Sequence, residues 1–217
     1  MEQLNGLQQR LENIYEVDLG YQVADFVITD PALAKKFDTS DNPRSSVEKL
    51  LIREDAGELS LLLYLDEALL SGWQHDKDAL KASERADFCT ILEGVSHFVY
   101  LCWNALQGRE VSCLELELQA EVDKFIMLVS THSTQDDGLE PHQLHDWLFD
   151  QPTFDHSLSQ TELIRYREAN HFAGKYCRQL ARTHLQQAKI DSNMLNEIRR
   201  FYRLSFHHKL RRIERPN

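Results

Sequence analysis

Apolar and polar residues alternate between residues 47 and 65. Two runs, VEKLLIR at 47–53 and LSLLLYL at 59–65, flank the short sequence EDAGE. The leucines of the second run occupy every other position, which places them on one face of a strand. A five-residue connection that contains Gly57 is typical of a hairpin loop. Because an isolated hairpin is only marginally stable, a third strand or a helix must cover it, and residues 22–29 are able to supply that strand.

The rest of the chain has mainly the three- to four-residue hydrophobic period of helices. A first helix is predicted at 3–15, while residues 17–29 fit either a helix or a strand. After Gly72, helices are expected at 78–106, 112–131, 141–149, 159–186 and 193–213. The pattern predicts an α+β fold that is mainly helical. A small N-terminal antiparallel β-hairpin or sheet (residues 1–72) precedes a bundle of about five helices (residues 73–217), and both parts form one compact domain.

The segment DFCTILEGVSHFVYLCW at 87–103 carries an acid and a histidine in a largely apolar helix. Glu93 and His97 are four positions apart, which is one helical turn. At about 100° per residue, both lie opposite the main apolar stripe, and this favours an exposed pair. However, Tyr100 and Trp103 extend the apolar surface around the other sides, and a helix that is apolar nearly all round is usually buried in its bundle. The two interpretations predict opposite exposures for this pair.

Carboxylates also mark the helix that follows. Glu117 and Glu121 are one turn apart beside its core stripe, and Lys124 comes next. A short connector joins the two helices, so they should pack antiparallel with their polar edges facing each other. Three carboxylates and one imidazole would then suit iron, manganese or zinc. The candidate metal ligands are Glu93, His97, Glu117 and Glu121. The alternative is that the charged residues form a solvated face and that His97 pairs with a carboxylate.

The C-terminal sequence IRRFYRLSFHHKLRR predicts a basic amphipathic helix. Residues 194–217 contain seven Lys or Arg and two Asp or Glu, whereas the rest of the chain contains 17 and 33. Such an acidic body repels nucleic acid, so a protein partner or self-association is favoured. The candidate partner-binding residues are Arg199, Arg200, Arg203, His207 and Arg211. The alternatives are docking onto the acidic body of the same chain and peripheral contact with an anionic membrane surface.

The sequence favours a cytoplasmic location. Its longest apolar run, FVYLCW, is far shorter than the about 18 residues that span a bilayer. The first residues, MEQLNGLQQRLENIY, lack the basic and apolar regions of a signal peptide, so none is expected. The four cysteines have no C-x-x-C spacing, and we interpret them as reduced core thiols.

Two functional hypotheses follow from these features. The first is a non-enzymatic binding or regulatory protein that acts through its helical bundle and basic C-terminal helix. The second is a metal-dependent enzyme, an oxidoreductase or a hydrolase, with a carboxylate and histidine site between helices 78–106 and 112–131. The first ranks higher because it makes smaller demands on the sequence. The chain contains no Gly-rich phosphate loop, nucleophile elbow or H-E-x-x-H motif that would select another class.

Overall fold

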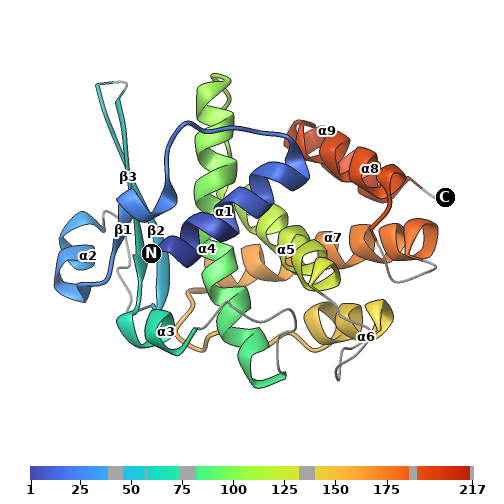
Figure 1. The fold of residues 1–217 in the computed structure, drawn as a ribbon, viewed down its shortest axis with the longest axis horizontal. Coiled ribbons are helices and arrows are strands. Elements are labelled where there is room, and N and C mark those ends of the chain that lie inside the picture. Colours follow the sequence, from blue (N-terminus) through green and yellow to red (C-terminus); the bar gives the residue numbers. More distant parts are fainter. Residues whose placement is uncertain (39–45, 57, 74–81, 132–139, 186–189, 216–217) are drawn as a thin grey trace.

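The computed structural model describes residues 1–38, 46–56, 58–73, 82–131, 140–185 and 190–215. Figure 1 shows how the elements of these segments are arranged. The helices are α1 (Glu2–Tyr15), α2 (Pro31–Phe37), α3 (Glu67–Gly72), α4 (Arg85–Leu106), α5 (Cys113–Ser130), α6 (Pro141–His145), α7 (Gln160–His184), α8 (Ser192–Tyr202) and α9 (Phe206–Glu214). The strands are β1 (Val27–Ile28), β2 (Glu48–Asp55) and β3 (Glu58–Leu65). The predicted α+β, mainly helical fold is confirmed.

The predicted hairpin is formed by β2 and β3, which pair antiparallel with Leu50 opposite Leu63. The third strand expected within residues 22–29 is the two-residue β1, which pairs parallel with β3 along its other edge. Residues 23–26 form a 3₁₀ turn, so the ambiguous segment is neither a full strand nor a full helix. Helix α2 packs on the hairpin, and α4 contacts both of its strands.

Helix α4 runs through the middle of the molecule (Figure 1). It contacts the hairpin, α1 and α5, and α5 is covered in turn by α7. The hairpin approaches α4 most closely at Gly94, where an added Cβ would lie 2.8 Å from Leu63 Cδ1 and 2.9 Å from Glu48 Oε1. Burial therefore extends around α4 and α5, as the apolar surface on several sides of α4 predicts.

One hydrophobic core joins the two halves of the chain. The same cluster of buried residues includes Leu4, Leu63 and Ile213, so residues 1–72 and 73–217 share their interior. Three cysteines are buried as expected, whereas Cys113 is exposed. Among the described segments, no helix has both the length and the apolar character needed to cross a membrane.

The prediction of a single C-terminal helix at 193–213 is wrong. Helix α8 ends at Tyr202, and α9 begins after Ser205 at its N-cap. The break lets α9 bury Lys209 and Ile213 against the body. The apolar spacing continues through the break, which is why periodicity alone does not reveal it. Docking onto the same chain, one of the alternatives for this segment, is what the structure shows.

The C-terminal helices are predicted to be an integral part of the core. Phe201 of α8 is 1% exposed and stacks on Tyr176 with a 3.8 Å centroid distance. Replacing Phe201 with Ala should lower the free energy of unfolding by about 3–5 kcal/mol, because it leaves a cavity. Urea denaturation measures this change. The control is Leu106→Ala, which alters an exposed side chain and should shift stability by about 0.5 kcal/mol or less. Equal stabilities for the two variants would contradict the docked arrangement.

Candidate metal centre

Helices α4 and α5 bring three of the four candidate ligands together. Glu93 and His97 are one turn apart on α4, and Glu117 lies on α5. One ligand atom from each of the three lies within 4.8 Å of the other two. The helical turn brings Glu93 and His97 together on α4, but Glu117 joins them only because α4 packs beside α5. The site is therefore built on two rigid elements rather than on a loop.

The fourth candidate, Glu121, belongs to the same cluster but is engaged by a cation. Lys124 Nζ lies 2.7 Å from Glu121 Oε1 and 2.6 Å from Glu93 Oε2. Lys124 thus bridges a carboxylate of α5 and a carboxylate of α4. Charge-assisted bonds of this length hold the acids in place. Glu121 serves this bridge and lies outside the group of three converging ligands.

The expectation of a solvated face is wrong. His97 is 7% exposed, Glu117 6% and Lys124 7%. The hairpin covers the polar side of α4 at Gly94, while α7 covers α5. These covering elements are distant in sequence, so the helical period of α4 and α5 gives no sign of them. The expectation that His97 pairs with a carboxylate is confirmed, because its Nε2 lies 3.3 Å from Glu117 Oε2.

Two further members of the cluster, Glu48 and Arg165, are not among the residues predicted from the sequence. Glu48 of β2 places Oε1 3.9 Å from His97 Nδ1. Arg165 of α7 places Nε 3.4 Å from Glu117 Oε1. The strand alternation that puts Glu48 and Leu50 on one face was the available signal for Glu48, since Leu50 packs against the main core. No comparable signal in the sequence pointed to Arg165.

Burial and mutual contact shift the protonation of these groups. Burial, followed by the nearby Glu93 charge, raises the pKa of Glu48 to about 8. Burial alone would lower the pKa of His97, but Glu117 and Glu48 outweigh it and raise that pKa to about 9. Burial would also lower the pKa of Lys124, and the adjacent carboxylates raise it instead. Both shifts therefore favour the protonated forms of Glu48 and His97.

Three buried polar atoms of the cluster lack a hydrogen-bond partner in the described part of the chain. They are His97 Nε2, Glu48 Oε1 and Arg165 Nε. The contact of His97 Nε2 with Glu117 brings the charges close without forming a hydrogen bond. Buried polar atoms are normally satisfied, so an imidazole nitrogen that faces a carboxylate without a hydrogen bond requires an explanation, and a bound water or ion would supply one.

A second convergent group, on α6 and the turn after it, is less suited to a metal. His145, Asp146 and Asp150 also place ligand atoms within 4.8 Å of one another. However, His145 Nε2 lies 2.8 Å from the carbonyl oxygen of Gly174, and Asp150 pairs with Arg178. The two acids are largely exposed, and exposed acidic groups often gather without binding an ion.

Two of the five candidate partner-binding residues hold the end of α1. Arg199 Nε donates to the carbonyl oxygen of Ile14 at 2.7 Å, and Arg203 Nη2 donates to that of Tyr15 at 2.8 Å. The last carbonyls of a helix have no intrahelical donor, and cations are favoured there. The exposed members of the predicted set include Arg200, His207 and Arg211.

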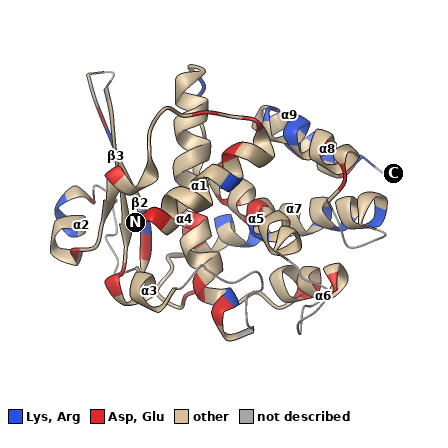
Figure 2. Cartoon of the chain, viewed as in Figure 1, with Lys and Arg blue, Asp and Glu red and all other residues tan. Residues whose placement is uncertain are grey.

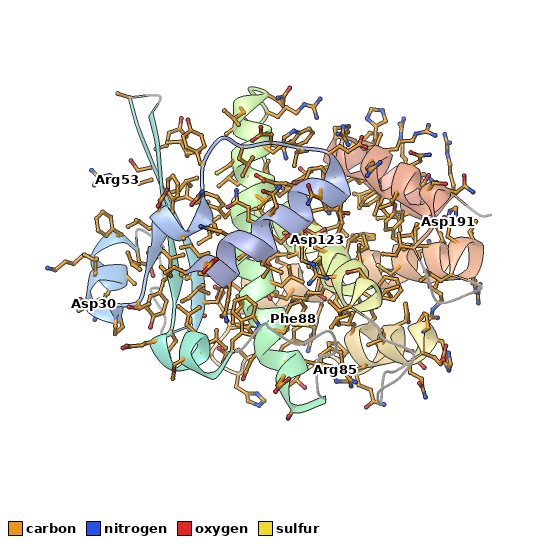
Figure 3. All side chains as sticks on the ribbon, viewed as in Figure 1. Asp30, Arg53, Arg85, Phe88, Asp123 and Asp191 are labelled. Atoms are coloured by element: carbon orange, nitrogen blue, oxygen red, sulfur yellow. The ribbon has the colours of Figure 1, made fainter. Side chains whose placement is uncertain are left out.

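A second buried network faces α1, α8 and α9. Lys209 Nζ donates to Tyr100 Oη at 2.7 Å and to Gln119 Oε1 at 2.8 Å. Tyr100 donates in turn to Glu115, and the Gln119 amide donates to Asp123. Figure 3 shows Asp123 near the centre of the molecule, between α1 and α5. This network places an ammonium group from the last helix inside the protein.

Comparisons with known proteins identify no relative. The chain matches no protein-family model, and neither the curated proteins nor the solved structures contain a significant match.

The buried ammonium predicts a specific pH dependence of stability. Burial lowers the pKa of Lys209 from 10.5 to about 7, although Glu115 and Asp123 oppose the shift. Between these pH values the unfolded chain holds the Lys209 proton and the folded chain does not, so the contribution of Lys209 to stability rises with pH. The difference in unfolding free energy between wild type and Lys209→Met should therefore increase from about pH 7 to about pH 10.

Urea denaturation at several pH values measures this difference. Lys175→Met, which removes an exposed lysine on α7, is the matched control. A stability difference between wild type and Lys209→Met that proves as independent of pH as that for Lys175→Met would contradict the prediction. That result would show that Lys209 keeps an ordinary pKa in the fold.

Proposed function

We propose that the chain binds a divalent metal ion through Glu93, His97 and Glu117. The observation that carries the proposal is the convergence of their three ligand atoms within 4.8 Å. His97 Nε2 is buried and faces Glu117 at 3.3 Å without a hydrogen bond, which also supports it. An imidazole nitrogen with carboxylate oxygens suits iron, manganese or zinc. The surrounding cations, Lys124 and Arg165, would orient the carboxylates from outside the ligand group.

The ligand number favours a catalytic role over a purely structural one. Structural zinc sites are usually closed by four protein ligands, whereas catalytic sites keep a position for water or substrate. Three protein ligands would leave such a position open. A bound ion there supplies Lewis acidity or an activated water. We therefore infer a metal-dependent enzyme, a hydrolase or an oxidoreductase. The free thiols of all four cysteines support a cytoplasmic location for it.

The metal proposal predicts that metal content depends on His97. Untagged wild-type protein, incubated with Fe²⁺, Mn²⁺ or Zn²⁺ and then desalted, should retain close to one equivalent of one of these ions. His97→Ala should retain almost none, because the imidazole is the one nitrogen donor among the three ligands. Elemental analysis by mass spectrometry measures the bound metal.

The matched control is His171→Ala, which removes an exposed histidine on α7. It should bind metal as the wild type does. Circular dichroism of both variants establishes that each is folded. A folded wild type that takes up none of the three ions would refute the proposal, and so would a His97→Ala variant that keeps its metal.

A second candidate function is binding to an acidic protein surface. Figure 2 shows Lys and Arg gathered on the end of α7 and on α8 and α9. Arg200, His207 and Arg211 remain exposed there, although other basic residues of these helices are used inside the fold. Since the rest of the chain is acidic, a second copy of the chain offers a complementary surface.

This candidate predicts self-association that depends on salt. At low ionic strength, sedimentation analysis should detect oligomers that dissociate in about 0.15 M salt, where exposed charges are screened beyond about 8 Å. The variant that combines Arg200→Glu with Arg211→Glu should stay monomeric. The variant with Lys35→Glu and Lys36→Glu makes the same charge change on α2 and should associate like the wild type. A monomeric wild type under all conditions would contradict self-association.

A further inference from the structure

Glu48 lies where a strand meets the candidate metal centre. It is the first residue of β2 and pairs with Leu65 of β3. Its side chain lies against Gly94 of α4, where an added Cβ would be 3.0 Å from Glu48 Cγ and 2.9 Å from Oε1. Glycine at position 94 therefore leaves the space that the Glu48 carboxylate occupies. Glu48 is thus the residue of the hairpin that places a carboxylate beside the candidate site.

The two nitrogens of His97 face different carboxylates. Nε2 lies 3.3 Å from Glu117 Oε2, and Nδ1 lies 3.9 Å from Glu48 Oε1. One of the three converging ligand atoms belongs to Glu117, and none of them belongs to Glu48. One side of the imidazole thus faces the candidate ligands, while the other side faces the hairpin. A metal ion among the ligands would be bound by Nε2.

We propose that Glu48 is a positioning residue that orients His97 for metal binding. This inference rests on the metal-binding function proposed above. A histidine that binds a metal through one nitrogen commonly donates its other N–H to a carboxylate, which fixes the tautomer and the direction of the ring. His97 Nδ1–H would donate to Glu48 Oε1. A small closure of the 3.9 Å separation makes that hydrogen bond and satisfies a buried oxygen that has no other partner in the described residues.

The experiment compares zinc binding by the wild type, Glu48→Ala and Glu48→Gln. Isothermal titration calorimetry with Zn²⁺ should show a 10- to 100-fold loss of affinity in Glu48→Ala, the range typical for outer partners of a metal ligand. Glu48→Gln should recover much of the affinity, because its amide oxygen still accepts a hydrogen bond. Glu54→Gln, at an exposed position on the same strand, is the control and should bind like the wild type.

Nuclear magnetic resonance of the zinc-loaded protein gives a readout that a merely structural role would not change. In the wild type, His97 should carry its proton on Nδ1, and that proton should exchange slowly with water. Glu48→Ala should expose the same proton to fast exchange. Gly94→Ala tests the geometry separately, because the new Cβ displaces the carboxylate without removing it. It should lower zinc affinity, and it keeps the proposal testable if Glu48→Ala fails to fold.

The outcomes separate this inference from the function on which it rests. A folded wild type that binds no zinc, iron or manganese overturns both. A wild type that binds zinc, with unchanged affinity and unchanged Nδ1–H exchange in the Glu48 and Gly94 variants, overturns the role of Glu48 alone and leaves the metal site intact. Loss of affinity in Glu48→Ala with recovery in Glu48→Gln supports the role of Glu48.

Discussion

The burial of ionisable side chains on the α4–α5 pair is the constraint on which the rest of the structure depends. A charge taken out of water must be paired or neutralised, and an unpaired one costs far more than a typical contact contributes. Lys124 pairs with Glu93 and Glu121 within the two helices, and further partners come from elsewhere in the chain. Glu48 comes from the hairpin, Arg165 from α7 and Lys209 from α9. The hairpin, α7 and α9 are thus each attached to the central pair by a polar group as well as by apolar contacts.

This arrangement places a separate network on each of two faces of the pair. One contains the converging acids and His97 beneath the hairpin, and the other contains Asp123 and Lys209 beneath α1, α8 and α9. Losing one member leaves its partner buried and unsatisfied, so each network is sensitive to the loss of any part. The difference between them lies in their completeness. Lys209 has hydrogen-bond partners, whereas His97 Nε2 does not have one among the described residues.

The features that could be predicted from the sequence are those carried by local spacing. The hairpin followed from the alternation at residues 59–65, and the convergence of Glu93, His97 and Glu117 followed from helical spacing and a short connector. What could not be predicted depends on elements that meet only in three dimensions. Arg165 reaches the site from α7, and Arg199 turns inward to the end of α1 because that helix leaves carbonyl oxygens unsatisfied. Amphipathic spacing identifies the polar face of a helix, but it cannot show what later covers that face.

The charge of the hairpin-facing cluster explains how Lys124 and Arg165 are compatible with a metal. The cluster holds four carboxylates and these two cations, so with His97 neutral it has two more negative than positive charges. The pKa values of Glu48 and His97 are both raised, so without a metal each group favours a bound proton, which offsets this negative charge. A divalent ion bound as proposed would supply two positive charges while those protons leave. Lys124 and Arg165 therefore reduce the excess negative charge of this buried cluster to two, which is the charge that one divalent ion would neutralise.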